Sequence, residues 1–486
     1  MASQSLSHSL PWPYVFNTAE KPIVLKIQPT KPARLPPTRN PHLILFTLAL
    51  LVFAVASQVM IVAPILTRIS EQLGVETAVL GTLITVYALT VAVFALISGP
   101  ISDRIGRRKV LLAGAGLMTM ALALHGLALN FTLLLVFRTL AGAAGGILSG
   151  AAVAYVGDYF PRDRRGWANG WIMSGMAAGQ IAGIPAGTLL AGYAGFQTPF
   201  LAFAVLMGLA FMLVWWTVPQ PDVPRAPDKL TLRTAFDSYR TLLRRRDVVA
   251  AAVAFFVMFG SIALYILYLP TWLEHTLGFG SVAIASLYFV GGSANVIAGP
   301  QAGKLSDQFG RKKIIIWTSF GIAFMMFITP LSPAASWLIY GVFFLMMAFF
   351  ASRASPFQAL MTELVSSEQR GSLMSLTLAI GQGGFGIGSA VAGFLYLQVG
   401  FAISTILAAF TTLVMAAVVW FFLPETKAQA SGVASEPPEP SMPKRVQSAL
   451  CGPCPEAGHM IRVIQHQCDQ GKVHPIAPGI GSTETQ

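Results

Sequence analysis

Charged residues are scarce in this sequence. Of its 486 residues, 11% are charged and 55% are hydrophobic, whereas a soluble chain of this length would comprise about three domains of about 150 residues. The composition excludes an ordinary soluble protein and is typical of a protein that spans a membrane. Cysteine is scarcer still, and all three cysteines follow residue 450. A disulfide therefore cannot hold the apolar part of the chain together.

In place of charge, the chain has long apolar stretches of about 20 residues, the length that a helix needs to cross about 30 Å of hydrocarbon. They lie at 42–64, 76–98, 109–129, 132–155, 168–193, 197–218, 247–270, 281–302, 313–331, 335–361, 371–397 and 400–423. Because hydrocarbon offers no water to backbone groups, such continuous runs predict helices rather than strands. We therefore predict an all-α membrane protein with twelve transmembrane helices.

Lysine and arginine fall almost entirely on one side of these predicted spans. Apart from Arg68 on the opposite side, and Arg138 and Arg353 within spans, every Lys and Arg lies in a terminus or in a connection on the same side. The positive-inside rule places that side in the cytoplasm. We expect a multi-pass protein of the inner (plasma) membrane with both termini cytoplasmic. The net charge of +12 then reflects topology rather than nucleic-acid binding.

The two ends of the chain differ from the apolar region. Residues 1–41 are polar and proline-rich and lack the apolar core of a cleavable signal peptide, and residues 424–486 are rich in Pro, Ser and Gly. We expect a disordered cytoplasmic arm and tail. "CGPC" at 451–454 matches a thioredoxin redox motif but lacks the flanking strand and helix. The Cys and His spacing in the tail matches no common zinc site, so we predict no metal and no cofactor.

A charged motif occurs twice in the chain. The string Ser102-Asp103-x-x-Gly106-Arg107-Arg108-Lys109 recurs as Ser306-Asp307-x-x-Gly310-Arg311-Lys312-Lys313. At nearly the same offset, a second match pairs Asp158, Arg165 and Gly166 with Glu363, Arg370 and Gly371. Two matches of this kind indicate an internal repeat. We therefore predict two six-helix halves, 42–218 and 247–423, joined by a cytoplasmic linker at 219–246.

With these motifs, the region 42–423 resembles the major facilitator superfamily, whose signature after the second span is a Gly, an Asp and a Gly-Arg-base-base cluster. The fourth predicted span is similar to a second motif of the family through Arg138, Gly142, Gly145 and Gly146. The fifth contains "GMAAGQIAGIPAG", which is similar to the Gly-Pro motif of the twelve-span drug:proton antiporters, except that Ile184 separates Gly183 from Pro185. The resemblance implies a membrane carrier built from two halves.

The resemblance also implies a conformational latch on the cytoplasmic side. In the family, the motif acid joins an ion-pair network across the two halves that stabilises the outward-open state. We expect Gly99 and Pro100 to give a tight exit from the second span and to hold Asp103 beside a helix end, where a carboxylate is stabilised by about 0.3–1 kcal/mol. The predicted latch residues are Gly99, Asp103, Gly106, Arg107, Arg108, Asp307, Gly310 and Arg311, with Asp158 and Glu363 as partners. The alternative is that the bases only anchor loops.

Acidic residues are missing from the middle of every predicted span, so no central carboxylate is available for proton coupling. Protonation at Asp103, Glu274 or His125 is the alternative. The resemblance associates Arg138 with proton coupling, whereas Arg353 matches no motif and is equally consistent with pairing to backbone carbonyls. Such a cavity would be neutral or positive, which favours neutral or anionic solutes over cations. The predicted path or coupling residues are Arg138, Arg353, Gln58, Gln180, Asn295, Gln382, Tyr265 and Tyr268.

Glycines cluster in the fifth and eleventh predicted spans, where small residues let helices approach closely. In the family's fold these spans line the seam between the halves. Proline within a helix removes one backbone hydrogen bond, so Pro185 is predicted to bend the fifth span. The predicted hinge or seam residues are Gly179, Gly183, Pro185 and Gly187.

The sequence thus predicts a secondary active transporter that works by alternating access. Its expected activity is export of a small amphiphilic or sugar-like solute in exchange for protons, as a monomer in the lipid bilayer. One alternative is a facilitator or proton symporter for uptake of an organic anion or metabolite. Another is a membrane sensor that does not transport, although complete motifs in both halves argue against it. An enzyme is not expected, because the spans contain no nucleophile–base pair or cluster of metal ligands.

Overall fold

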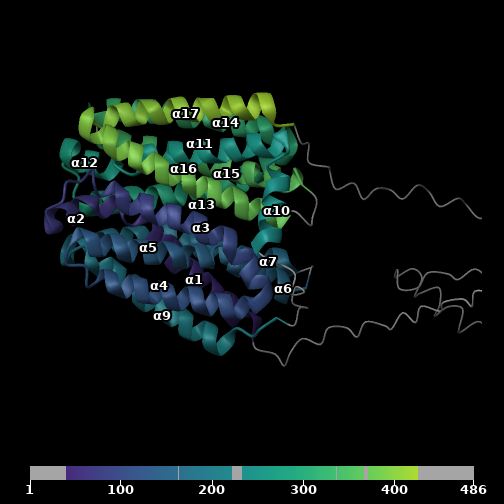
Figure 1. The fold of residues 1–486 in the computed structure, drawn as a ribbon. Helices are drawn as coiled ribbons and strands as arrows, with labels where there is room; N and C mark the ends of the chain where they lie inside the picture. The colour runs from purple at the N-terminus through teal and green to yellow at the C-terminus, as the bar shows by residue number, and fades with distance from the viewer. Residues whose placement is uncertain (1–39, 162–163, 222–231, 335, 366–369, 425–486) are drawn as a thin grey trace, which may run out of the picture. The chain divides into compact units, whose positions relative to one another are not determined.

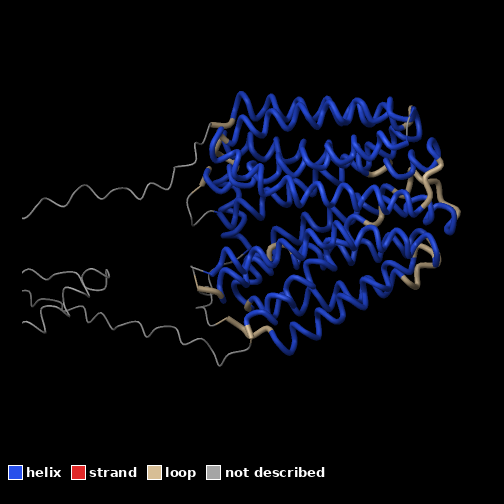
Figure 2. The backbone as a smooth tube through the Cα atoms, turned by 180° about the vertical axis from the view of Figure 1, so that it is seen from behind, coloured by secondary structure: helices blue, strands red, loops and turns tan. Residues whose placement is uncertain are grey.

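A computed structural model describes residues 40–161, 164–221, 232–334, 336–365 and 370–424. The predicted arm and tail, with the CGPC motif, fall almost entirely outside these ranges. Every regular element in the described ranges is a helix, as Figures 1 and 2 show. This confirms the predicted all-α class.

The first half is a series of helices with short interruptions. Its elements are α1 (Pro41–Met60), η1 (Ala63–Ile65), α2 (Leu66–Leu73), α3 (Gly81–Ile105), α4 (Arg107–His125), α5 (Phe131–Leu148), α6 (Ala151–Tyr159), α7 (Arg165–Ala178), η3 (Gly179–Gly183), α8 (Ile184–Ala194) and α9 (Gln197–Thr217). Asparagine side chains supply the missing acceptor at two helix starts. Asn40 accepts a hydrogen bond from the His42 amide before α1, and Asn130 accepts one from the Leu133 amide before α5.

The second half repeats this order after a linker that contains the helix α10 (Leu232–Leu242). Its elements are α11 (Arg246–Ile266), α12 (Leu269–Leu277), α13 (Ser281–Phe309), α14 (Arg311–Ile328), η4 (Thr329–Ala334), α15 (Ser336–Glu363), α16 (Arg370–Gln398) and α17 (Phe401–Phe422). Each predicted span therefore coincides with a helix or with a short helical series.

The repeated charged motif forms the same turn in both halves. Gly106 has φ +101° and Gly310 has φ +98°, a region in which a side chain would be strained. The expected tight exit at Gly99 is wrong, because Gly99 and Pro100 lie inside α3, which runs to Ile105. A proline removes only one amide donor from a helix, whereas the left-handed conformation of Gly106 ends it.

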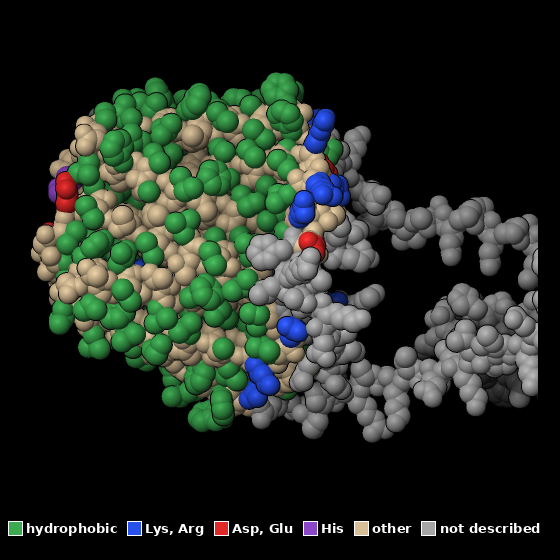
Figure 3. Space-filling view, viewed as in Figure 1, with side chains coloured by type: hydrophobic (Ala, Val, Ile, Leu, Met, Phe, Trp, Pro, Cys, Tyr) green, Lys and Arg blue, Asp and Glu red, His purple; other side chains and the backbone are tan. Residues whose placement is uncertain are grey.

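Ten helices in the described residues are long and apolar enough to cross a membrane. The other two predicted spans, 109–129 and 168–193, coincide with α4, which begins with three basic residues, and with the series α7, η3 and α8. The count of twelve is consistent with this arrangement and stays a prediction. Hydrophobic side chains cover the flanks of the bundle in Figure 3, and exposed ones include Phe46, Trp317, Trp337 and Phe421.

The two halves meet along helices that are distant in sequence. α3 packs against α16, and α13 packs against α8 and η3. At one end of the bundle α2 contacts α12, while α6, α7 and α10 lie at the other end (Figure 1). Lys and Arg gather at this second end in Figure 3. We call it the basic end and the end with α2 and α12 the opposite end.

Candidate functional site

A cavity of about 120 Å³ lies between the two halves. The first half contributes Met60, Gln180 and Ile184 to its wall. The second half contributes most of the wall, including the aromatic residues Phe259, Tyr288, Phe343, Phe350 and Phe385. Among the described residues that line it, none is charged. A largely apolar wall with a few polar groups is typical of a site for a small organic molecule.

One polar pair in this wall joins the two halves. The Asn295 side-chain amide, on α13, donates a hydrogen bond of 3.0 Å to the Gln180 side-chain oxygen, in η3. Both residues line the cavity. The two predicted path residues therefore lie together, and their hydrogen bond bridges the seam at the cavity.

Gln180 belongs to a turn of π-helix, η3, which interrupts the fifth predicted span directly before α8, the helix that begins with Ile184 and Pro185. π turns inside α-helices occur frequently at functional sites. Glycine lets this turn approach α1 closely: a Cβ on Gly179 would lie 2.9 Å from the Phe53 carbonyl oxygen, and one on Gly183 would overlap the Ser57 hydroxyl. The predicted hinge residues thus surround the irregular turn that presents Gln180 to the cavity.

A third polar group of the wall is the Tyr288 hydroxyl. Tyr288 is 7% exposed, and its hydroxyl has no hydrogen-bond partner among the described residues. Tyr288 and Asn295 are seven residues apart on α13, so they share one face and are separated by about 10 Å along the helix axis. Polar groups therefore occupy two separate places on an otherwise apolar wall.

Arg138 lies in a buried polar cluster of the first half. Its side chain is 0% exposed and donates a hydrogen bond of 3.3 Å to the Gln58 side-chain oxygen. The Gln58 amide in turn donates to the Tyr87 hydroxyl at 2.9 Å, and the guanidinium lies 4.6 Å from the centroid of the Tyr87 ring. Gln58 and Arg138, which were predicted to line the path, thus bind each other outside the cavity wall.

Arg353 is the second buried cation and has different surroundings. It is also 0% exposed, and none of its three guanidinium nitrogens has a hydrogen-bond partner among the described residues. Its guanidinium carbon lies 5.8 Å from the centroid of the Phe350 ring. Since Phe350 lines the cavity, the cation of Arg353 lies next to the cavity wall.

The remaining predicted path residues lie elsewhere. The Tyr265 hydroxyl forms a hydrogen bond of 3.0 Å with the Thr329 hydroxyl inside the second half. The Tyr268 hydroxyl donates to the Ala78 carbonyl oxygen at 2.8 Å and so joins the halves near the opposite end. Gln382 is partly exposed on α16 and does not line the cavity.

Further contacts join the two halves at and near the opposite end. The Glu274 carboxylate on α12 accepts a hydrogen bond from Thr67 on α2, and one of its oxygens has no partner among the described residues. Closer to the cavity, the Thr85 hydroxyl donates to the Gly386 carbonyl oxygen at 3.0 Å. The cavity is thus separated from the opposite end by contacts that would have to break for it to open there.

Ion pairs at the basic end are repeated in the two halves. Arg107 binds Asp158 at 2.6 Å, and Arg311 binds Glu363 at 2.8 Å and Asp307 at 3.6 Å. Each of these pairs lies within one half, so the expected network across the halves is not seen among the described pairs. The Asp103 side chain lies outside the described residues.

The second base of each motif has a partner that the sequence analysis missed. Arg108 donates to the Trp215 carbonyl oxygen at 2.6 Å, and its guanidinium lies 5.9 Å from the Trp215 ring centroid. In the second half, Lys312 donates to the Leu423 carbonyl oxygen at 2.8 Å and lies 5.8 Å from the Trp420 ring. Each base therefore ties the motif to the last helix of its own half.

The linker contacts both halves at this end, through α10 and through Arg245, which follows α10. The Tyr239 hydroxyl on α10 donates to the Leu96 carbonyl oxygen of α3 at 3.0 Å, and burial raises the pKa of this phenol. Arg245 donates to the Leu364 carbonyl oxygen at 2.8 Å. The linker is therefore part of the packed structure at the basic end.

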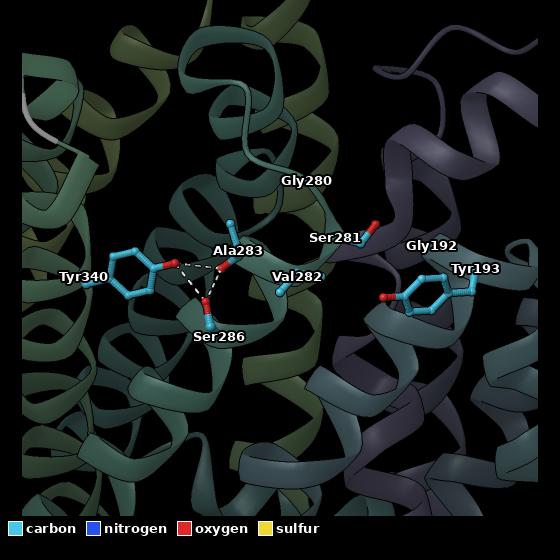
Figure 4. A pocket seen from close by; sticks show the side chains of 8 residues that line it. All are labelled: Gly192, Tyr193, Gly280, Ser281, Val282, Ala283, Ser286 and Tyr340. Carbon is cyan, nitrogen blue, oxygen red and sulfur yellow. Dashed lines mark hydrogen bonds between the residues drawn. The ribbon is translucent and has the colours of Figure 1, made fainter.

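A second hollow, of about 580 Å³, lies where α8 and α13 meet at the opposite end (Figure 4). Tyr193 stands on one side and Tyr340 on the other, and the Tyr340 hydroxyl lies 2.8 Å from the Ser286 hydroxyl. Tyr193 is 82% exposed, so this hollow opens to the outside of the bundle. It is a groove on the surface of the seam, distinct from the central cavity.

The phenylalanines of the cavity wall were not among the predicted site residues. Their signal in the sequence is a spacing, since Phe343, Met347 and Phe350 are four and three residues apart on α15 and thus share one helix face. The same spacing is common in ordinary helix packing, so only the position of the facing helices distinguishes a cavity wall from a packed core.

Comparisons with known proteins show what the chain is similar to. The model of the Major Facilitator Superfamily matches residues 48–336 and 284–454. The MFS-type transporter YceJ of Bacillus subtilis is 26% identical over 347 residues, 71% of this chain and 87% of that protein. The multidrug resistance protein MdtG of Proteus mirabilis is 28% identical over 354 residues, 70% of this chain and 86% of that protein.

Among solved structures, the crystal structure of a D-xylose-proton symporter superposes with a TM-score of 0.64 and covers 80% of this chain and 98% of that chain. Its sequence identity is 19%, so the likeness concerns the fold. The matched family model covers most of the helical region and both halves. The chain belongs to the major facilitator superfamily, a family of multi-pass membrane transporters rather than enzymes.

Proposed function

We propose that the chain exports a small, largely apolar solute in exchange for protons. The observation that carries this proposal is the cavity between the halves, whose wall is apolar and aromatic and includes Gln180 from one half and Asn295 from the other. The similarity to proteins named multidrug resistance protein MdtG supports export. The solute, the protons and the lipid bilayer are then its partners, and the chain works as a monomer.

Alternating access is the proposed mechanism. Contacts such as that of Tyr268 with the Ala78 carbonyl close the opposite end, so opening toward that side requires the halves to separate there. Small residues let the helices of the two halves pack closely along the seam. Gly292 on α13, for example, faces η3 so closely that an added Cβ would lie 3.0 Å from the Ile181 Cα. The basic end is proposed to face the cytoplasm, together with both termini.

The ion pairs Arg107–Asp158 and Arg311–Glu363 are proposed to latch the basic end. In each half the pair connects the turn after the second span to the end of the fourth. It therefore fixes the turn that directly follows the helix end with Asp103 or Asp307, and we propose that this positions the motif acid for a contact across the seam. The pairs themselves act as positioning contacts within a half.

Glu274 is proposed to take up the coupling proton. Its carboxylate hydrogen-bonds Thr67 of the other half at the opposite end, and it is flanked by the charges of Arg68, Glu71 and His275. Protonation removes its charge and changes which hydrogen bonds it can form. A change in protonation would thus alter a contact that must break for that end to open.

Proton-linked uptake is the second candidate, because Ile184 interrupts the antiporter Gly-Pro motif. The direction of solute movement relative to the protons distinguishes export from uptake. The chain is reconstituted in vesicles loaded with a neutral fluorescent dye, and a pH gradient is imposed in either sense. Export by exchange predicts that the dye moves against its gradient in the direction opposite to the protons, and empty vesicles provide the control. Movement in the same direction as the protons would establish uptake, and dye movement equal to that in empty vesicles would contradict both.

A further inference from the structure

We infer that Arg353 binds the anionic group of a substrate whose apolar body occupies the central cavity. The transported solute would then be an amphiphilic organic anion, such as an aryl carboxylate. This inference rests on the proposed transport function and narrows it to one chemical class of substrate.

The first observation is the isolation of the charge. Arg353 is 0% exposed, and its Nε, Nη1 and Nη2 atoms have no hydrogen-bond partner among the described residues. The ion pairs of the described residues do not include Arg353. A buried charge without a partner is costly, and charged residues inside a membrane usually pair or face a cavity. A group from outside the chain is the natural partner for this guanidinium.

Arg138 provides the comparison within the same chain. It is buried equally deeply, but a hydrogen bond to Gln58 and the face of the Tyr87 ring stabilise its charge. Its Nε and Nη2 atoms have no hydrogen-bond partner among the described residues, so Gln58 and the Tyr87 ring satisfy the Arg138 guanidinium in part. Arg353 has no hydrogen bond among the described residues and only the Phe350 ring beside its guanidinium, so it keeps more unfilled donors for a ligand than Arg138 does, directly behind a residue of the cavity wall.

The second observation is the position of Arg353 relative to the cavity. Phe343, Met347 and Phe350 of α15 line the cavity, and Arg353 follows Phe350 by three residues, about 4.5 Å along the helix axis. This displacement points toward the basic end, because α15 ends there at Glu363. An apolar body packed on the Phe350 ring would place an attached carboxylate on the side where the guanidinium lies.

The third observation is the charge of the surroundings. The described residues that line the cavity include no acid, so nothing in the wall repels an anion. Arginine also presents a planar fork of donors that matches a carboxylate in a bidentate geometry. The combination of an aromatic wall and one unpaired guanidinium therefore favours a carboxylate on an apolar body over a cation of similar size.

The test compares an acid with its neutral ester. The purified full-length chain is titrated with 1-naphthylacetate and with methyl 1-naphthylacetate, and binding is followed through thermal unfolding. The acid is expected to bind about ten-fold more tightly than the ester, the size of one charged hydrogen bond. In Arg353→Met the acid should lose this advantage while the ester binds as before. Arg244→Gln, which removes an exposed positive charge, should retain the preference for the acid.

Arg353→Met is expected to fold, because it replaces an unpaired buried charge with an apolar side chain of similar length, and Arg353→Gln serves as a second variant. Equal binding of acid and ester to the wild type, or an acid preference that survives both substitutions, would overturn the inference. If the chain exports the dye but does not prefer the acid to the ester, the proposed function stands and the inferred anion site is wrong. If the preference for the acid depends on Arg353 but neither compound is transported, the anion site is supported and the proposed transport function is wrong.

Discussion

Asn295 and Gln180 are linked by a hydrogen bond of 3.0 Å that runs from one half of the molecule to the other, inside the wall of the central cavity. The two residues are far apart in sequence and lie on elements that pack along the seam, α13 and η3. A contact in this position has two consequences. It holds the halves together around the cavity, and it competes with any polar group of a solute that enters.

Asn295→Leu is expected to change transport more than folding. Loss of a hydrogen bond between membrane helices costs about 0.6 kcal/mol on average, so the thermal midpoint of unfolding should change little. The Michaelis constant for a neutral dye should change clearly, because Gln180 then faces the solute alone. Ser293→Ala is the control, since Ser293 is exposed on the same helix and bonds only its own backbone. Identical transport by both variants would show that the pair does not contact the solute.

Asp158→Asn is expected to reduce transport with little loss of stability. The pair with Arg107 is partly exposed, and exposed pairs contribute about 0–1 kcal/mol. Glu363→Gln should act in the same way in the second half, because it removes the matching pair with Arg311. The measurement is transport normalised to the amount of inserted protein. Asp247→Asn, which breaks a partly exposed pair with Arg245 outside both motifs, is the control, and an equal effect of Asp247→Asn would argue against a specific latch.

Gln58→Leu is expected to destabilise the first half. The substitution removes the acceptor of the Arg138 guanidinium, and a buried hydrogen bond to a charged group contributes about 1.5–3 kcal/mol. The double variant Gln58→Leu with Arg138→Met should be more stable than Gln58→Leu alone, because no unpaired charge remains. Thermal unfolding of the wild type, both single variants and the double variant measures this coupling. If the two substitutions change the stability to unfolding additively, the two side chains do not interact.

Gly183→Ala is expected to disturb the π turn. The added methyl would overlap the Ser57 side chain on α1, and overpacking of this kind costs about 1–3 kcal/mol. Gly157→Ala is the matched control, since nothing lies within 4 Å of a Cβ at that position. The midpoint temperature of thermal unfolding and the transport rate should both decrease in Gly183→Ala. Both should remain near the wild-type values in Gly157→Ala. Equal behaviour of the two variants would show that α1 and η3 are not in close contact in the working protein.

Glu274→Gln is expected to uncouple transport from protons. The amide keeps the shape of the carboxyl group and cannot gain or lose a proton at neutral pH. The variant should still carry solute down its gradient, but an imposed pH gradient should no longer drive accumulation. Glu76→Gln, an exposed acid near the same end, serves as the control. Gradient-driven accumulation at the wild-type rate in Glu274→Gln would move the coupling site elsewhere.

The sequence by itself determined the helices and their grouping. Apolar runs long enough to span hydrocarbon predict helices without any tertiary information, because only a helix satisfies its backbone within one segment there. The duplicated Gly-Arg-base-base motif likewise predicted the two halves, and in the structure it forms matching turns at Gly106 and Gly310. The end of the second span was predicted wrongly, since Gly99 and Pro100 lie inside α3.

Only the tertiary structure decided which side chains meet. Arg138 and Arg353 look alike in the sequence, yet one has Gln58 and Tyr87 as partners and the other has an unpaired guanidinium beside Phe350. Spacing along a helix shows which residues share a face, but it does not show which face of a distant helix packs against them. The cavity wall, the hydrogen bond across the seam and the unpaired guanidinium of Arg353 all depend on that packing.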